Sequence, residues 1–96
     1  MTLDVKSNSI PKDQVKNAVV SALKNRVEEI NRKLDDLNQN LEYFQRKYLL
    51  NSGDFYVKFT KGDMDDEMDF FEWKASLEIF QELKKEKLAL LEALND

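Results

Sequence analysis

Six acidic residues crowd the segment 63–72, and their type and spacing invite metal chemistry. They are Asp63, Asp65, Asp66, Glu67, Asp69 and Glu72, with no basic residue among them. An EF-hand calcium loop starting at Asp63 would need glycine at its sixth position and glutamate at its twelfth. Those positions hold Met68 and Lys74, so we expect no metal site. Two interpretations stay open: the start of a helix, where acids cap and complement the helix dipole, or a docking surface for a basic partner.

The chain lacks the side chains on which most catalytic sites depend. It contains no cysteine and no histidine, so its serines have no imidazole base and no thiolate zinc site can form. Helical di-metal sites need two Glu-x-x-His motifs, and two glycines in all cannot build a phosphate-binding loop. We therefore expect a protein that is not an enzyme, with no catalytic residues, no metal and no cofactor.

Helices must position the acidic segment, because two glycines and one proline cannot supply the turns of a sheet protein. From Pro11 to about Leu50, apolar residues recur at alternating spacings of three and four. They are Val20, Leu23, Val27, Ile30, Leu34, Leu37, Leu41, Phe44 and Tyr48. This 3.5-residue repeat predicts a coiled-coil-like seam along a helix over about 11–50.

A second helix is predicted over about 65–94, where glycine and proline are again absent and a broad apolar stripe includes Phe70, Trp73 and Phe80. We expect it to run back along the first helix, with Trp73 in an aromatic core at the turn. Glutamates spread along it would then face the basic flanks of the first helix; they are Glu72, Glu78, Glu82, Glu86 and Glu92. Because the first helix is longer, its amino-terminal turns should stay uncovered.

The remaining segments are shorter. Residues 1–10 are expected to form a flexible or strand-like tail, with Ser9 as the N-cap and Pro11 in the first turn of the helix. Residues 53–60, between the two glycines, could be a strand or a short helix; we favour the helix, with Ser52 as its N-cap, since a lone strand has no pairing partner. Residues 11–96 then form a single helical-hairpin domain.

The predicted fold is thus all-α: a long antiparallel helical hairpin with a short helical connector. We expect it to oligomerise with itself, as a dimer or higher oligomer, because two helices cannot bury both apolar stripes. No apolar run is long enough to span a membrane and no secretory signal is visible, so we expect a cytoplasmic protein.

Charge and small apolar residues suggest where a partner would bind. Residues 1–33 hold seven basic and four acidic residues, a net charge of +3. Because the net charge of the whole chain is −4, the remaining residues carry a net charge of −7. Val15 and Val19 belong to an apolar patch that either packs within the protein or fills the groove of another protein. With Asp63, Asp65, Asp66, Glu67 and Asp69, they are the candidate partner-binding residues. A small DNA-binding regulator using the basic third, or a purely structural coiled coil, are the alternatives; the net negative charge disfavours nucleic acid.

Several short motifs also carry a family resemblance. They are Ile10-Pro11-Lys12-Asp13, Phe44-Gln45-Arg46-Lys47-Tyr48, Ser52-Gly53-Asp54-Phe55-Tyr56, Gly62-Asp63 and Asp69-Phe70-Phe71-Glu72-Trp73. In these the chain resembles a group of small archaeal and bacterial proteins described as antitoxin-like members of toxin–antitoxin pairs. It departs from them at Leu49-Leu50, where the pattern has glycine after the tyrosine. The resemblance implies a subunit that neutralises a toxin, such as a nuclease or a nucleotidyltransferase, by direct contact.

Overall fold

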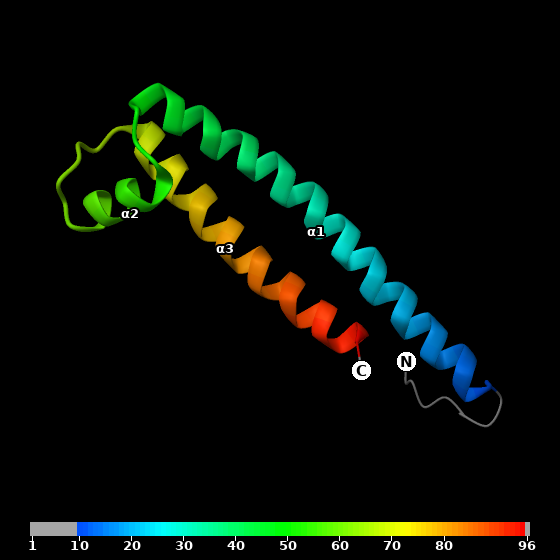
Figure 1. Ribbon diagram of the computed structural model, residues 1–96. Coiled ribbons are helices and arrows are strands. Elements are labelled where there is room, and N and C mark those ends of the chain that lie inside the picture. The colour runs from blue at the N-terminus through cyan, green and yellow to red at the C-terminus, as the bar shows by residue number, and fades with distance from the viewer. Residues whose placement is uncertain (1–9, 96) are drawn as a thin grey trace.

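The protein is a hairpin of two long helices with a third, short helix at the turn (Figure 1). The computed structural model describes residues 10–95, and these form α1 (Lys12–Tyr48), α2 (Ser52–Thr60) and α3 (Met68–Leu94), with no strand among them. The predicted all-α hairpin is therefore confirmed, and the connector is a helix. The predicted tail, apart from Ile10, and the predicted cap at Ser9 lie outside the described residues.

Helices α1 and α3 lie side by side and antiparallel, and the amino-terminal end of α1 projects past the end of α3 (Figure 1). Lys47 contacts Asp69 near the turn, and Arg26 contacts Glu86 further along, which fixes the register of the two helices. Since α1 has 37 residues and α3 has 27, α1 is longer by ten residues, nearly three turns, and this excess lies at its amino-terminal end. We call residues 12–21 the overhang.

The ends of the long helices differ slightly from the predicted ones. Pro11 precedes α1 rather than standing in its first turn, and its carbonyl accepts hydrogen bonds from the N–H groups of Gln14 and Val15. The carboxyl-terminal end of α1 comes at Tyr48, and Leu49 follows with φ 52° and ψ 47°. This left-handed conformation usually falls to glycine after a helix. Leu49 thus stands at the position where the resemblance noted in the sequence leads us to expect glycine.

The caps of the other two helices correct two expectations. Asn51, not Ser52, caps α2: its side-chain oxygen accepts the N–H of Asp54 at 2.8 Å. Helix α3 begins at Met68, three residues later than predicted, and Glu67 at its N-cap position makes no side-chain cap. Asp65 and Asp66 lie in the loop before the helix and so do not cap it. Asp69 alone among the crowded acids stands in the first turn of α3.

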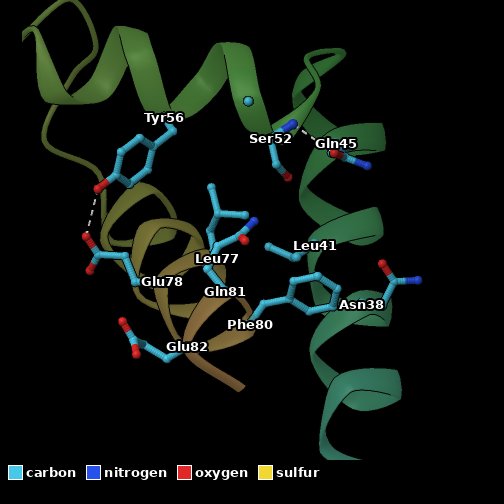
Figure 2. Close-up of a pocket in the computed structure, with 11 residues that line it drawn as sticks. Asn38, Leu41, Gln45, Ser52, Tyr56, Leu77, Glu78, Phe80, Gln81 and Glu82 are labelled. Carbon is cyan, nitrogen blue, oxygen red and sulfur yellow. Dashed lines mark hydrogen bonds between the residues drawn. The ribbon is translucent and has the colours of Figure 1, made fainter. Parts of the chain in front are cut away.

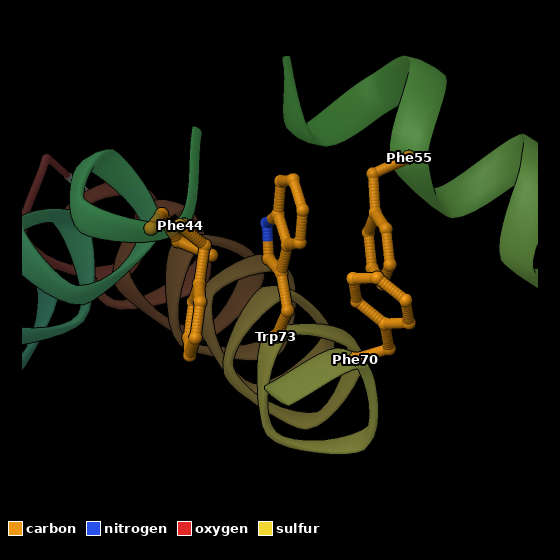
Figure 3. Packing of buried hydrophobic residues seen from close by; sticks show 5 residues of the cluster. Phe44, Phe55, Phe70 and Trp73 are labelled. Atoms are coloured by element: carbon orange, nitrogen blue, oxygen red, sulfur yellow. The ribbon is translucent and has the colours of Figure 1, made fainter. Parts of the chain in front are cut away.

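The densest packing lies at the turn, where α2 closes over the ends of α1 and α3. Trp73 is fully buried, and its ring stacks on Phe55 with centroids 3.9 Å apart and planes 4° apart, while Phe44 flanks its other side (Figure 3). The indole N–H donates to the Ser52 hydroxyl at 3.0 Å, so the buried polar atom is satisfied. The prediction that Trp73 belongs to an aromatic core at the turn is confirmed.

Away from the turn the packing is thinner. We call residues 38–80, which include α2, the head, and residues 12–37 with 81–94 the stalk. All nine positions of the predicted seam are buried or half-buried, so the 3.5-residue repeat does mark the face of α1 that meets α3. Within the stalk, however, Ile30 is the one hydrophobic residue that is fully buried among those described.

Candidate functional site

The turn between α2 and α3 presents acidic side chains to solvent. Asp63, Asp65, Asp66 and Glu67 are all exposed, and the ion pairs found among residues 10–95 involve none of them. Only Glu67 approaches another side chain, the Tyr48 hydroxyl at 3.5 Å. We call these four residues the acidic turn. Their carboxylates are free to meet a basic partner.

Asp69 behaves differently from its acidic neighbours, because the fold already uses it. Its carboxylate lies 2.7 Å from the Lys47 ammonium and accepts the Tyr48 hydroxyl at 2.6 Å. The hydrogen bonds from Lys47 and then Tyr48 lower the pKa of Asp69, and the bond to Asp69 raises the pKa of both partners. This candidate residue therefore joins α1 to α3 within the chain.

The overhang carries the other candidate residues. Val15 and Val19 are 48% and 53% exposed, and they lie one turn apart in the amino-terminal part of α1, the end of the helix that projects past α3 (Figure 1). From Val19 to the end of α1 is 29 residues, about 43 Å along the helix. The structure therefore places the two predicted docking elements, the overhang and the acidic turn, at opposite ends of the molecule.

A groove that the sequence did not predict opens beside α2. Its volume is about 900 Å³, its floor is formed by Leu41, Leu77 and Phe80, and the first turns of α2 close one end (Figure 2). Polar residues line its edges: Asn38, Gln45, Ser52, Tyr56, Glu78, Gln81 and Glu82. The sequence gives little indication of this groove. Asn38 and Gln45 each directly follow a seam residue, a position at which polar residues ordinarily form the solvent-exposed flank of a helix. The groove exists because α2 covers only part of this face.

Charged contacts between the long helices are fewer than predicted. Arg26 binds Glu86 through two nitrogens, at 2.7 and 2.9 Å, and also binds Glu29 at 2.6 Å. These bonds lower the pKa of Glu86 and Glu29 and raise that of Arg26. Of the glutamates expected to face α1, Glu86 forms an ion pair with it.

The other glutamates find partners closer by. Glu72 accepts a long hydrogen bond of 3.4 Å from Asn40. Glu78 and Glu82 pair with Lys74 and Lys85 on their own helix. Lysines three or four residues away on the same helix are within easy reach, whereas the outer flank of α3 points away from α1.

Metal and membrane chemistry find no support in the part of the chain that the structure describes. Residues 10–95 contain no group of three or more acidic side chains placed to hold a metal ion. None of the helices α1 to α3 combines the length and the apolar character needed to cross a membrane.

Comparison with known proteins identifies no relative of this chain. No protein-family model matches the chain, and no curated protein and no solved structure matches it either. Any functional conclusion must therefore come from the chain's own surfaces: the overhang, the acidic turn and the groove.

Proposed function

We propose that this chain is a non-enzymatic protein-interaction module, an antitoxin-like cytoplasmic subunit that binds and neutralises a partner toxin. The exposure of Val15 and Val19 on the overhang carries this proposal. Two β-branched apolar residues one turn apart, on a helix end that nothing in the described chain covers, suit insertion into an apolar groove of another protein. The family resemblance of the sequence points to the same class of partner.

The acidic turn supplies a second contact of opposite character. Its four exposed carboxylates would meet a basic surface, and charge complementarity of this kind speeds association and orients the partner. Nucleases and nucleotidyltransferases carry basic surfaces because they bind phosphates. The partner we propose therefore has an apolar groove and a basic patch.

Self-association is the second part of the proposal. A dimer or higher oligomer would cover the half-buried seam of the stalk, where Leu23, Leu34 and Leu37 keep contact with solvent. A purely structural coiled-coil oligomer is the alternative function favoured by this seam. The two differ in one respect: the structural protein needs no exposed valines on the overhang.

Co-expression with the product of the adjacent open reading frame tests the proposal. A neighbouring protein that arrests growth alone and is relieved by this chain is the expected result. Replacing Val15 and Val19 together with Asp should weaken the complex about tenfold or more, while the melting temperature stays close to that of the parent because both sites are exposed.

Ile79→Asp is the matched control, since Ile79 is equally exposed but lies on α3; it should leave the complex intact. Equal loss of binding in both variants would point to non-specific contact and contradict the proposal. A DNA-binding regulator would instead show binding to duplex DNA that weakens steeply between low and high salt, because phosphate contacts would involve exposed lysines of the overhang such as Lys12 and Lys16.

A further inference from the structure

The loop between α2 and α3 is closed at its base by two aromatic rings. Phe59, in the last turn of α2, and Phe71, in the first turn of α3, meet edge to face with ring centroids 5.3 Å apart. The chain between them bows outward at the turn end of the hairpin (Figure 1). Surface loops whose ends are held together in this way are frequently functional.

Four apolar side chains lie on this loop or at its ends. Met68 is 82% exposed and Phe71 is 50% exposed, whereas Phe59 and Met64 are half-buried against the aromatic core. Met68 and Phe71 stand three residues apart, so they are neighbours on one side of α3. Methionine side chains are flexible and polarisable, and they recur on surfaces that bind apolar partners. We call these four residues the Met–Phe patch.

The acidic turn belongs to the same loop. All four of its residues lie between Phe59 and Phe71, and backbone hydrogen bonds tie both of its ends to the adjoining helices. The N–H of Asp63 donates to the carbonyl of Lys58 at 2.9 Å, and the N–H of Phe71 donates to the carbonyl of Glu67 at 3.4 Å. The backbone therefore holds the acidic turn beside the Met–Phe patch.

The fold leaves the negative charge of this region largely unpaired. Residues 58–72 hold two lysines and six acidic residues, a net charge of −4. The lysines, Lys58 and Lys61, are exposed, and the ion pairs found among residues 10–95 involve neither of them. Of the six acidic residues, only Asp69 takes part in those ion pairs. An exposed apolar patch beside unpaired carboxylates is complementary to apolar side chains carried among basic ones.

We propose that the Met–Phe patch and the acidic turn together bind a basic amphipathic helix of a partner protein. Apolar residues along one side of that helix would cover Met68 and Phe71, and its lysines and arginines would reach the carboxylates of the acidic turn. This deepens the proposed function, on which it rests for the existence of a partner, by naming the element that the acidic turn binds. It uses neither the overhang nor the seam of the stalk.

A helix suits this surface better than other ligands. Extended peptides commonly bind by adding a strand to the edge of a sheet, and residues 10–95 contain no strand. Met68 and Phe71 instead form part of a helical ridge, against which the ridges of a second helix can pack. A metal ion is no alternative, since the described residues hold no group of three or more acidic side chains placed to bind one.

A second copy of this chain is the competing occupant, because the overhang also combines exposed valines with lysines. Its ten residues hold two lysines and one aspartate, a net charge of +1. This charge matches the −4 of residues 58–72 poorly, and a partner helix richer in basic residues matches it better. Binding between copies is therefore an outcome that the experiment must distinguish.

Binding of a synthetic peptide to the full chain tests the inference. The probe is an amphipathic peptide of about 18 residues, or five helical turns, with leucines along one face and lysines along the other. Fluorescence anisotropy of the labelled peptide should show saturable binding that weakens as added salt screens the charges. A peptide of the same composition, with its leucines scattered around the helix, should bind at least about tenfold more weakly.

Variants of α3 test the Met–Phe patch. Met68→Ala combined with Phe71→Ala should weaken peptide binding about tenfold or more, because both side chains lose area that the peptide would bury. Met68→Ala alone changes a side chain that is 82% exposed, so the fold is preserved, and it should weaken binding about threefold or more.

Ile79→Ala is the matched control for the patch. Ile79 is 50% exposed, as is Phe71, but it stands seven residues from both Glu72 and Glu86, which contact α1. It therefore lies on a different flank of α3 from Phe71, which faces the end of α2. Peptide binding should be unchanged in this variant.

A second set of variants tests the acidic turn. Asp65→Asn combined with Asp66→Asn should weaken peptide binding about fivefold at about 0.1 M salt, and much less at about 1 M, where the screening length falls to about 3 Å. Asp35→Asn combined with Asp36→Asn is the matched control. This pair is also exposed and removes the same charge, but it lies about 20 Å from the end of α1. It should change binding by less than about twofold, because that distance exceeds the screening length at 0.1 M salt.

Failure of the proposed function is distinguishable from failure of this inference. Val15→Asp combined with Val19→Asp should disrupt the toxin complex but leave peptide binding unchanged, because the overhang lies at the other end of the molecule. A chain that binds the peptide but relieves no toxin would contradict the proposed function alone.

Each other outcome of the peptide experiment overturns the inference. No binding by the parent, or equal binding of the scattered peptide, removes the amphipathic helix as the occupant. Unchanged binding in both Met68 variants, or equal weakening in Ile79→Ala, removes the Met–Phe patch. Equal effects of the two aspartate pairs would mean that net charge alone attracts the peptide. Sedimentation equilibrium tests the second copy: self-association that Met68→Ala abolishes would assign this surface to a contact between copies instead.

Discussion

The head and the stalk are built from the same two helices, yet they hold together in different ways. In the head, α2 supplies a third side, and Leu41, Phe44, Phe55, Phe70 and Trp73 form a continuous buried cluster. In the stalk the same seam continues with aliphatic residues, and only Ile30 among those described is fully buried. Two helices bury one line of side chains between them, whereas a third encloses a volume. Stability should thus reside in the head and association in the stalk.

The sharpest test of this difference is Trp73→Ala in the head. Trp73 fills the space between α1, α2 and α3, and removing a buried large aromatic side chain costs about 3–5 kcal/mol. That loss rivals the whole stability of a small domain, so we expect cooperative thermal unfolding, followed by circular dichroism, to disappear. Phe71→Ala is the control, because Phe71 is half exposed and its loss should leave a cooperative transition.

The corresponding change in the stalk is Ile30→Ala, and its effect on folding should be smaller. Truncation of a buried isoleucine costs about 2–5 kcal/mol, and a two-helix layer can relax toward the cavity, which favours the low end. Urea unfolding should show a cooperative transition at a lower midpoint with an unchanged slope. A loss equal to that of Trp73→Ala would mean that head and stalk are equally packed.

Ion pairs let pH act on the two regions separately. Lys47 and Tyr48 lower the pKa of Asp69 in the head, and Arg26 lowers that of Glu86 in the stalk. A carboxylate with a depressed pKa stabilises the fold above its unfolded pKa, about 4, and this contribution is lost as pH falls through the lower folded value. Stability measured in urea should therefore decline below about pH 4.

Two variants show which ion pair causes this loss of stability at low pH. Asp69→Asn should be less stable than the parent at pH 7, and the gap should narrow as the pH drops below about 4. Glu86→Gln should do the same for the stalk. Asp63→Asn, in the exposed acidic turn, controls for the loss of one negative charge. A gap that stays constant down to pH 2 would show that the ion pair contributes nothing.

Much of this architecture could be predicted from the sequence because it depends on local periodicity. The seam from Val20 to Tyr48 predicted helix α1, and the stripe through Phe70, Trp73 and Phe80 predicted which side of α3 faces the core. The uncovered overhang followed from helix lengths alone. These features need only the repeat of 3.5 residues and the absence of helix breakers.

The groove could not be predicted because it depends on where α2 docks. Ser52 illustrates the difficulty: its position before a short helix suggested an N-cap, a role that Asn51 takes, while the Ser52 hydroxyl accepts the indole N–H of Trp73, 21 residues away. Asp69 likewise resembled its acidic neighbours, and only the register of α3 against α1 brings it to Lys47. Long-range contacts of this kind leave no periodic trace.

The smallest expected effect concerns Leu49, whose left-handed backbone conformation must be stabilised by packing elsewhere in the head. The left-handed conformation costs a residue with a side chain about 1–2 kcal/mol of conformational free energy. Because Leu49 is 89% exposed, burial of its side chain offsets little of this cost. Glycine removes this cost but loses about 0.5–1 kcal/mol of backbone entropy on folding. Leu49→Gly should therefore stabilise the protein by up to about 1 kcal/mol, which corresponds to a rise in Tm of about 4–8 °C for a domain of this size.

The matched control is Leu49→Ala, which removes the same exposed side chain but keeps the left-handed strain. Its melting temperature should stay close to that of the parent, because alanine also has a Cβ that meets the neighbouring carbonyl. If both variants melt alike, the turn after α1 holds no strain, and leucine at position 49 costs no stability. If only glycine stabilises, the packing of the head holds the α1–α2 turn in a conformation that leucine disfavours, and the stalk contributes nothing to this compensation.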